Sequence, residues 1–271
     1  KALVELGANV NAQDKDGRTS LHEAAFNGNT NMVKVLVELG ADMCMEDKCG
    51  DTALDIAVVR EHIETVKVLV ELGADVCIQD MNRCSTLHLV ARLGHAEMVR
   101  MMVAGGSDMG AHDNNGCTAL HGAACWGHSE TVKVIVESGV DANAQDKNGE
   151  TALHKASRWG HTETVKVLVD LEADVNSQDT NGRTALHKAA LWGHTETVKA
   201  LVELGVDICI EEMNRCSVLH LVARLGCAET VMMMVDRGAD VYVQDDNGRT
   251  ALHEAARCGH PETVKVLVEL G

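Results

Sequence analysis

Apolar positions along the chain fall into two short helical patterns separated by a turn. In residues 179–211, the stretch "ALHKAALW" is followed by "ETVKALVEL", whose apolar residues recur at helical spacing. "DTNG" has the composition of a turn, and Thr184 and Gly193 are placed to begin and end the first helix. Glu196 falls in the first turn of the second helix, and Gly205 follows its end. The pattern predicts two short helices followed by an extended loop.

This unit recurs every 33 residues without an insertion. A half repeat at 1–13 precedes seven full repeats, and a partial repeat at 245–271 follows; the full repeats are 14–46, 47–79, 80–112, 113–145, 146–178, 179–211 and 212–244. Two short helices cannot bury their apolar faces alone, whereas stacked units can. We therefore expect a single domain over residues 1–271.

Composition narrows the class of protein. The chain is 45% hydrophobic but 2% aromatic, so its core must be built from Ala, Val, Leu and Met. No apolar run is long enough to span a membrane, and a net charge of −17 disfavours nucleic acid as a partner. Ten Cys without a CxxC motif favour an intracellular, cytoplasmic protein. Because the chain starts and stops within a unit, we expect a monomeric segment of a longer protein.

The recurring pattern "TALH…AA…GH…VKVLVE" resembles the ankyrin repeat, and the resemblance covers the whole chain. It implies an all-α ankyrin-repeat solenoid of helix-turn-helix units with protruding β-hairpin loops and a concave face that binds proteins. One departure is systematic, because Ser20, Ala152 and Ala185 stand where the family usually has Pro.

Histidine fills two positions of the unit. Seven lie in the T-x-L-H position, where the resemblance implies hydrogen bonds between neighbouring repeats; they are His22, His88, His121, His154, His187, His220 and His253, while Asp55 takes that position in the second unit. Six more follow the first helix, so "HGAACWGH" could suggest a metal site. Gly127 separates its two histidines into different elements, and we favour a structural role over a metal.

No motif points to catalysis. No nucleophile lies beside a base, and "AGGSDMG" lacks the ending of a nucleotide-binding loop. We expect no enzyme activity and no cofactor. The pairs Cys77/Cys84 and Cys209/Cys216 could form a redox switch, but residues 75–97 and 207–229 match at an offset of 132, so duplication explains them.

The three tryptophans occupy one position of the unit. With the first residue of each unit numbered 1, Trp126, Trp159 and Trp192 are at position 14, and Phe26 is at position 13. The resemblance places positions 2, 3, 5, 13 and 14 on the concave face and loop tips. We favour a partner-binding surface, extended by Leu93 and Leu225; the alternative is that Trp shields the turn that ends the helix.

Charge is unevenly distributed over these positions. They hold eleven basic and four acidic residues, a balance of +7, which leaves −24 for the rest of a chain of net charge −17. This asymmetry predicts an acidic, partly apolar peptide or helix as partner. Its expected contacts include Arg92, Arg158, Arg183, Arg224, Arg249 and Arg257.

Four residues replace glycines of the unit. Glu61 and Glu172 stand at helix ends, and Arg83 and Arg215 stand in turns. If the left-handed backbone is kept, each replacement costs about 1 kcal/mol.

These observations favour a non-catalytic scaffold or adaptor that binds a partner protein. Two alternatives remain at this point. The segment could be the recognition part of a larger kinase, ubiquitin ligase or ion channel, or it could be a mechanical spring without a ligand. The spring predicts no charge asymmetry and ranks last.

Overall fold

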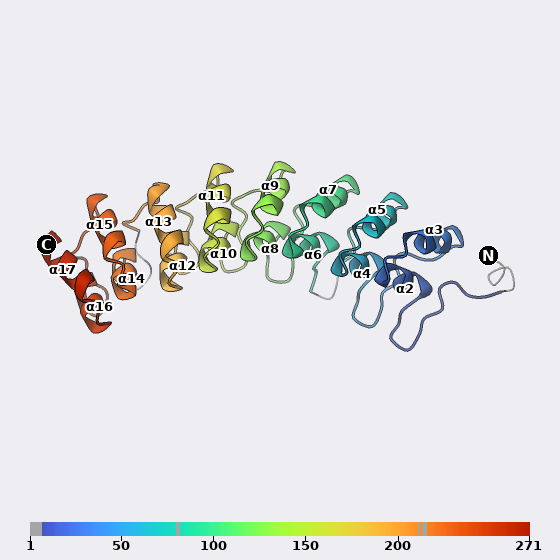
Figure 1. The fold of residues 1–271 in the computed structure, drawn as a ribbon, viewed down its shortest axis with the longest axis horizontal. Coiled ribbons are helices and arrows are strands. Elements are labelled where there is room, and N and C mark those ends of the chain that lie inside the picture. The colour runs from blue at the N-terminus through green and yellow to red at the C-terminus, as the bar shows by residue number, and fades with distance from the viewer. Residues whose placement is uncertain (1–6, 80–81, 211, 213–215) are drawn as a thin grey trace. The chain divides into compact units, whose positions relative to one another are not determined.

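A computed structural model describes residues 7–79, 82–210, 212 and 216–271. Within these residues it contains sixteen helices and no strand (Figure 1). The first helices of the pairs are α2 (Ser20–Phe26), α4 (Ala53–Val59), α6 (Thr86–Leu93), α8 (Ala119–Cys125), α10 (Ala152–Arg158), α12 (Ala185–Leu191), α14 (Val218–Leu225) and α16 (Ala251–Arg257). The second helices are α3 (Thr30–Glu38), α5 (Ile63–Glu71), α7 (Ala96–Ala104), α9 (Ser129–Glu137), α11 (Thr162–Asp170), α13 (Thr195–Glu203), α15 (Ala228–Asp236) and α17 (Pro261–Leu270). The predicted all-helical repeat solenoid is confirmed.

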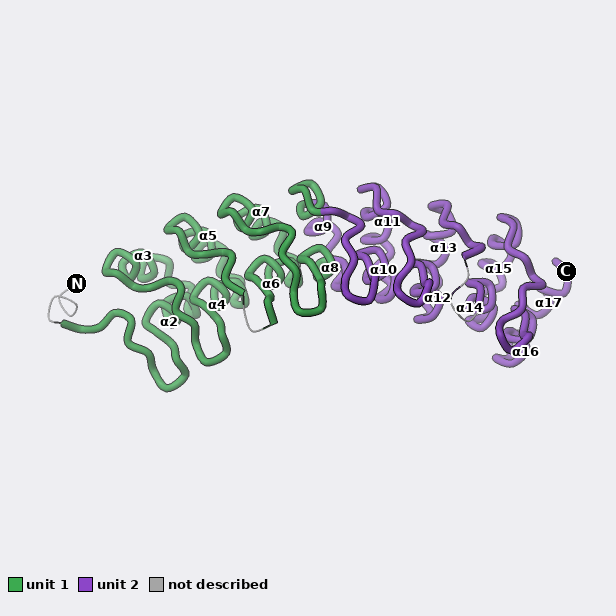
Figure 2. The backbone as a smooth tube through the Cα atoms, turned by 180° about the vertical axis from the view of Figure 1, so that it is seen from behind, with its two compact units in different colours: residues 1–123, 134–140 green, residues 124–133, 141–271 purple. Residues whose placement is uncertain are grey.

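The chain forms two compact units, residues 1–123 with 134–140 (unit 1) and residues 124–133 with 141–271 (unit 2) (Figure 2). In unit 1, first helices α2, α4 and α6 pack in sequence, as do second helices α3, α5 and α7. In unit 2, the same stacking joins α10, α12, α14 and α16 in one row and α11, α13, α15 and α17 in another. Equivalent positions of successive repeats therefore become neighbours within each unit.

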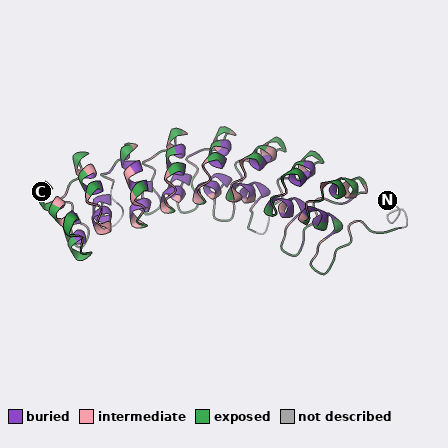
Figure 3. Ribbon diagram, viewed as in Figure 1, coloured by how far each residue is buried: buried purple, intermediate pink, exposed green. Residues whose placement is uncertain are grey.

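The core is aliphatic, as the composition predicts. Buried residues are concentrated in the first helix of each pair (Figure 3). Leu153 and Leu186 of these helices and Val165 and Leu168 of α11 are each at most 1% exposed. Alanines such as Ala156 let neighbouring helices approach closely, which removes the need for aromatic side chains.

The histidine of the T-x-L-H position lies at the start of most first helices, and in several repeats it also bonds the next repeat. The Thr151 N–H donates to Nδ1 of His154 at 3.1 Å, and Nε2 of His154 bonds the Arg183 carbonyl at 2.8 Å. Three other histidines make the same bond to a carbonyl 29 residues on; they are His22, His88 and His220. His187 differs, because its buried Nε2 has no partner among the described residues, and burial lowers its pKa to about 4.

Glycine ends the first helix for two physical reasons. Gly160 has a φ of +73°, and a Cβ on it would lie 2.5 Å from Nδ1 of His194. His194 also bonds the Arg158 carbonyl at 2.9 Å, so the imidazole rests against the end of the preceding helix. Gly28, Gly127 and Gly226 make the same close approach to a histidine of the following repeat.

The three described residues that replace glycine keep the left-handed backbone. Their φ values are +58° at Glu61, +60° at Arg83 and +65° at Glu172. The condition under which these replacements are expected to cost stability is therefore met at these positions, whereas Arg215 lies outside the described residues. The stacked repeats impose the conformation even where the side chain opposes it.

The loops are tight turns. The Asp179 N–H donates to the Arg183 carbonyl at 2.8 Å, and its carboxylate accepts the N–H groups of Asn181 and Arg183. Among the described residues the only bridge of β type outside the helices joins Gln79 to Ser85. Among the described residues, the expected β-hairpins are therefore turns without strands. Neighbouring loops also bond each other, because the Thr180 N–H donates to the Asn148 carbonyl at 2.9 Å.

Candidate partner-binding face

The three tryptophans of unit 2 are exposed apolar side chains. Trp126, Trp159 and Trp192 are 60%, 53% and 55% exposed, and each follows the last residue of a first helix. Because α10 and α12 are adjacent, Trp159 and Trp192 stack with ring centroids 6.4 Å apart and an angle of 24° between planes. We call Trp126, Trp159 and Trp192 the tryptophan row.

Arg158 lies against this row. Its guanidinium carbon is 5.9 Å from the Trp159 ring centroid and 4.9 Å from that of Trp192, within the range of a cation–π interaction. Its Nε is buried without a hydrogen-bond partner, and no carboxylate among the described residues pairs with it. The Arg158 guanidinium therefore lies against the stacked rings and still has hydrogen-bond donors that no described residue uses.

A buried chain of ion pairs lies on the same helices. Lys155 and Lys188 are one helical turn before Trp159 and Trp192, on the same side of α10 and α12. The Lys155 ammonium contacts Asp146 at 2.7 Å and also contacts Glu150. The Lys188 ammonium contacts Glu150 at 2.5 Å.

Lys188 extends the chain to the turn of its own repeat, where it contacts Asp179 at 2.6 Å. Asp146 and Asp179 are the residues that hold the two turns closed. The ion pairs thus fasten two turns to the two helices that carry stacked indoles.

Glu150 is the centre of this chain, and it is 5% exposed. Burial alone would raise the pKa of its carboxyl, but hydrogen bonds from Lys155 and Lys188 outweigh it and lower the pKa to about 2. The Glu150 carboxylate is therefore ionised at neutral pH.

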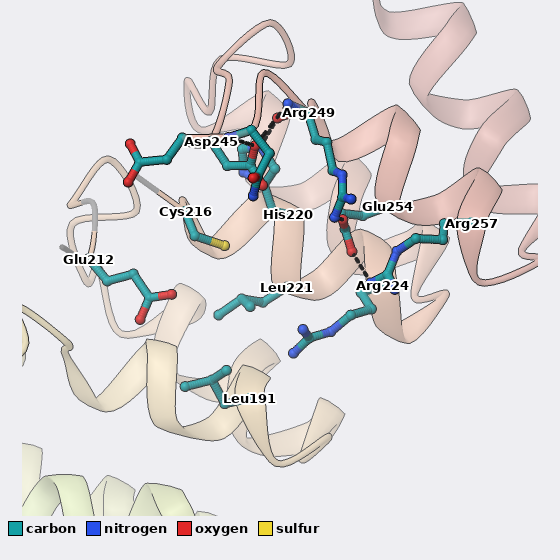
Figure 4. Close-up of a pocket in the computed structure, with 12 residues that line it drawn as sticks. Leu191, Glu212, Cys216, His220, Leu221, Arg224, Asp245, Arg249, Glu254 and Arg257 are labelled. Atoms are coloured by element: carbon teal, nitrogen blue, oxygen red, sulfur yellow. Dashed lines mark hydrogen bonds and ion pairs between the residues drawn. The ribbon is translucent and has the colours of Figure 1, made fainter. Parts of the chain in front are cut away.

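Several arginines expected to face a partner already bind carboxylates of the chain. Arg183 contacts Glu212 at 2.5 Å. Glu254 lies between Arg257 at 2.7 Å and Arg249 at 3.7 Å (Figure 4). The sequence-based charge balance counted these arginines without their partners, so the positive charge available on this face is smaller than +7.

Arg224 lines a pocket of about 310 Å³ together with Arg249, Glu254 and Arg257, and Leu191 and Leu221 border it (Figure 4). No carboxylate among the described residues forms an ion pair with its guanidinium, in contrast to Arg249 and Arg257. Leu225, the last residue of α14, is half-buried beside it. Arg158 and Arg224 are therefore the arginines of unit 2 best placed to bind an external carboxylate.

Unit 1 carries the other expected contacts. Phe26 is half-buried and covered by two guanidinium groups, Arg60 at 3.8 Å and Arg18 at 5.5 Å from its ring centroid. Arg92 is exposed and Leu93 is half-buried at the end of α6. The aromatic ring of Phe26 is thus covered by the chain's own cations.

Metal-ligand side chains converge at one place among the described residues, Asp47, Cys49 and Asp51, whose ligand atoms lie within 4.8 Å of one another. The Asp47 carboxylate accepts the N–H groups of Cys49 and Asp51 and contacts Arg18 at 3.5 Å. These bonds account for the grouping as a closed turn.

The helical repeats match known family models. The model described as "Ankyrin repeats (3 copies)" matches residues 1–80, 78–146 and 130–212, and "Ankyrin repeats (many copies)" matches residues 219–268. The chain belongs to the ankyrin-repeat family. A comparison with curated proteins found no match.

Ankyrin repeats are in general protein–protein interaction modules. Within the residues that the structure describes, no helix is both long and apolar enough to cross a bilayer. The family thus assigns the general role, and the side chains of the face must supply the specificity.

Proposed function

We propose that the protein is a non-catalytic scaffold that binds a partner protein through the tryptophan row and Arg158. The supporting observation is the exposed Trp159–Trp192 stack with Arg158 against both rings. The face belongs to the first helices, which form the concave side in the family.

The chemistry of the row selects the partner. Each indole offers a large, rigid apolar surface, and Trp and Arg are the residue types most often found to dominate binding energy at interfaces. A carboxylate of the partner would accept the free donors of Arg158, while an adjacent apolar side chain would cover the indoles. The partner is therefore an acidic segment with apolar side chains, either extended or helical.

The test is capture from a cell lysate with the full chain and a Trp126→Ala/Trp159→Ala/Trp192→Ala variant, followed by identification of the bound proteins. We expect a bound protein to be lost from the variant while circular dichroism stays unchanged. Replacing Arg158 by Gln should then weaken the same interaction by about tenfold, the effect of one charge-assisted hydrogen bond.

A matched control removes apolar surface elsewhere in unit 2. Met232, Tyr242 and Val268 are 42%, 66% and 61% exposed, and replacing all three by Ala should leave capture unchanged. If both triple variants retain the same proteins as the parent, the tryptophan row is not the binding surface.

A further inference from the structure

The ends of the first helices carry no acidic residue. With each unit numbered from its first residue, positions 13 and 14 of the eight units hold sixteen residues, of which five are Arg and none is Asp or Glu. In unit 2, position 14 carries the tryptophan row, Leu225 and Cys258. Position 13 of unit 2 holds, in order, Cys125, Arg158, Leu191, Arg224 and Arg257. We call these five residues the arginine row; it has a positive charge on each side of Leu191.

The helices that carry Arg158, Leu191 and Arg224 are packed in sequence. α10 ends at Arg158, α12 ends at Leu191, and Arg224 is in the last turn of α14. α10 contacts α12, and α12 contacts α14. Leu191 therefore lies between the two arginines, and the Arg224 side chain extends toward it (Figure 4). The arginine row offers a cation, an apolar surface and a second cation in succession, beside the exposed Trp192.

The two arginines that flank Leu191 have hydrogen-bond donors to offer. No described carboxylate forms an ion pair with Arg158 or Arg224, whereas Arg257, the next in the row, contacts Glu254 at 2.7 Å. The Arg158 guanidinium lies against both stacked indoles, and its buried Nε has no hydrogen-bond partner. Each of these guanidinium groups can therefore donate to a carboxylate from outside the chain.

The pocket that Arg224 lines is not itself the binding site that we infer. Four carboxylates and three arginines line it, so the pocket as a whole does not attract an anion. The helix ends differ, because positions 13 and 14 of unit 2 contribute only arginines, apolar side chains and cysteines. A carboxylate that lies over Leu191 can meet Arg224 without entering the pocket.

The separation of the two arginines sets the length of a segment that reaches both. Axes of packed helices lie about 8–10 Å apart, so two repeats span about 16–20 Å. An extended chain advances about 3.3 Å per residue, and this span corresponds to about five or six residues. Residues of an extended chain share a face only at even separations, which selects about six.

We propose that the partner contributes an extended segment with two acidic residues about six positions apart, which bind Arg158 and Arg224. Two apolar side chains between them, on the same face of the segment, pack on Leu191 and Trp192. This proposal rests on the proposed function and narrows it to an extended partner. A helix rises 1.5 Å per residue, so it would need its acidic residues about 11–13 positions apart.

The experiment compares two peptides of equal composition, Ac-Glu-Ser-Leu-Ser-Leu-Ser-Glu-NH2 and Ac-Glu-Ser-Glu-Ser-Leu-Ser-Leu-NH2. Only the first places its carboxylates at both arginines. The full chain is titrated and binding is followed by tryptophan fluorescence, because the three residues of the tryptophan row are the only tryptophans of the chain. We expect the first peptide to bind about tenfold more tightly than the second, the effect of one further charge-assisted contact.

Two variants locate the second carboxylate. Arg224→Gln should remove the difference between the peptides, because both would then use Arg158 alone. Arg237→Gln is the matched control, since Arg237 is an exposed arginine of unit 2 that follows α15, outside the arginine row, and the difference should persist in it. Equal affinity of the two peptides for the parent, a difference that survives in Arg224→Gln, or no fluorescence change with either peptide would each overturn the proposal.

These outcomes are distinct from failure of the proposed function. If the triple tryptophan variant loses a captured protein while the two peptides bind the parent equally, the tryptophan row binds a partner without the second carboxylate contact. If the triple variant retains every captured protein, the proposed function fails, whatever the peptides show.

Discussion

Replacing Glu150 by Gln should destabilise unit 2 by about 3 kcal/mol at neutral pH. The variant side chain keeps the shape of a protonated carboxyl but lacks the negative charge that joins Lys155 to Lys188. The pKa of Glu150 falls from 4.5 to about 2 in the folded protein, and each unit of pKa corresponds to 1.36 kcal/mol, which gives about 3 kcal/mol.

The same linkage sets a pH dependence. Because the folded-state pKa lies below the unfolded value, the stabilisation is complete above pH 4.5 and is lost as the pH falls toward 2. By pH 3 about 2 kcal/mol of it should be gone. The difference between parent and Glu150→Gln should shrink by that amount between pH 7 and pH 3.

Urea unfolding followed by hydrogen exchange in α10 and α12 measures the difference, since it reports on unit 2 even if the repeats do not unfold in one step. Glu163→Gln in α11 is the control, because Glu163 is an exposed carboxylate of the same unit. A Glu150→Gln variant as stable as the parent at pH 7, or a loss that is the same at pH 7 and pH 3, would refute the reasoning.

Three further predictions concern single positions. Glu172→Gly should raise the midpoint of urea unfolding by an amount equivalent to about 1 kcal/mol, because φ at this position is +65°. Gly160→Ala should destabilise the protein by about 1–3 kcal/mol more than Gly205→Ala, as both have positive φ but only Gly160 lies against His194; equal losses in urea would contradict this. The His187 ring should stay neutral down to about pH 4 in an NMR titration. Because the unfolded chain protonates near 6.5, stability should fall as the pH drops from 6.5 toward 4; an ordinary titration near 6.5 would contradict it.

The 33-residue periodicity of the sequence predicts most of the fold. Each position of a 33-residue unit has one environment, so Leu153 could be assigned to the core and Trp159 to the surface from their positions. The left-handed backbone at Glu172 also follows from the period, because its neighbours in register are glycines. For these residues the local pattern and the stacked structure agree.

The ion pairs could not be predicted in the same way. Glu150, at position 5 of its unit, was counted among the acidic residues of the partner-binding face, yet it is buried between Lys155 and Lys188. Both lysines are at position 10, which was not among the positions counted for charge. Lys188 is 38 residues from Glu150, so their contact depends on how adjacent repeats are rotated and spaced. Periodicity gives the environment of a position but not the distance between two different positions in neighbouring repeats.

The contact of glycine with the histidine of the next repeat has a consequence for recombination within the gene. Gly193 faces Leu225 rather than a histidine, because Cys227 stands in the histidine position of the following repeat, whereas Gly226 faces His260. A deletion of residues 212–244 would preserve the 33-residue period and bring His260 next to Gly193. A deletion of residues 179–211 would preserve the period equally well but leave Gly160 facing Cys227. Repeats of equal length are therefore not interchangeable. A repeat can be lost without penalty only where the deletion leaves the glycine that ends a first helix next to a histidine of the following repeat.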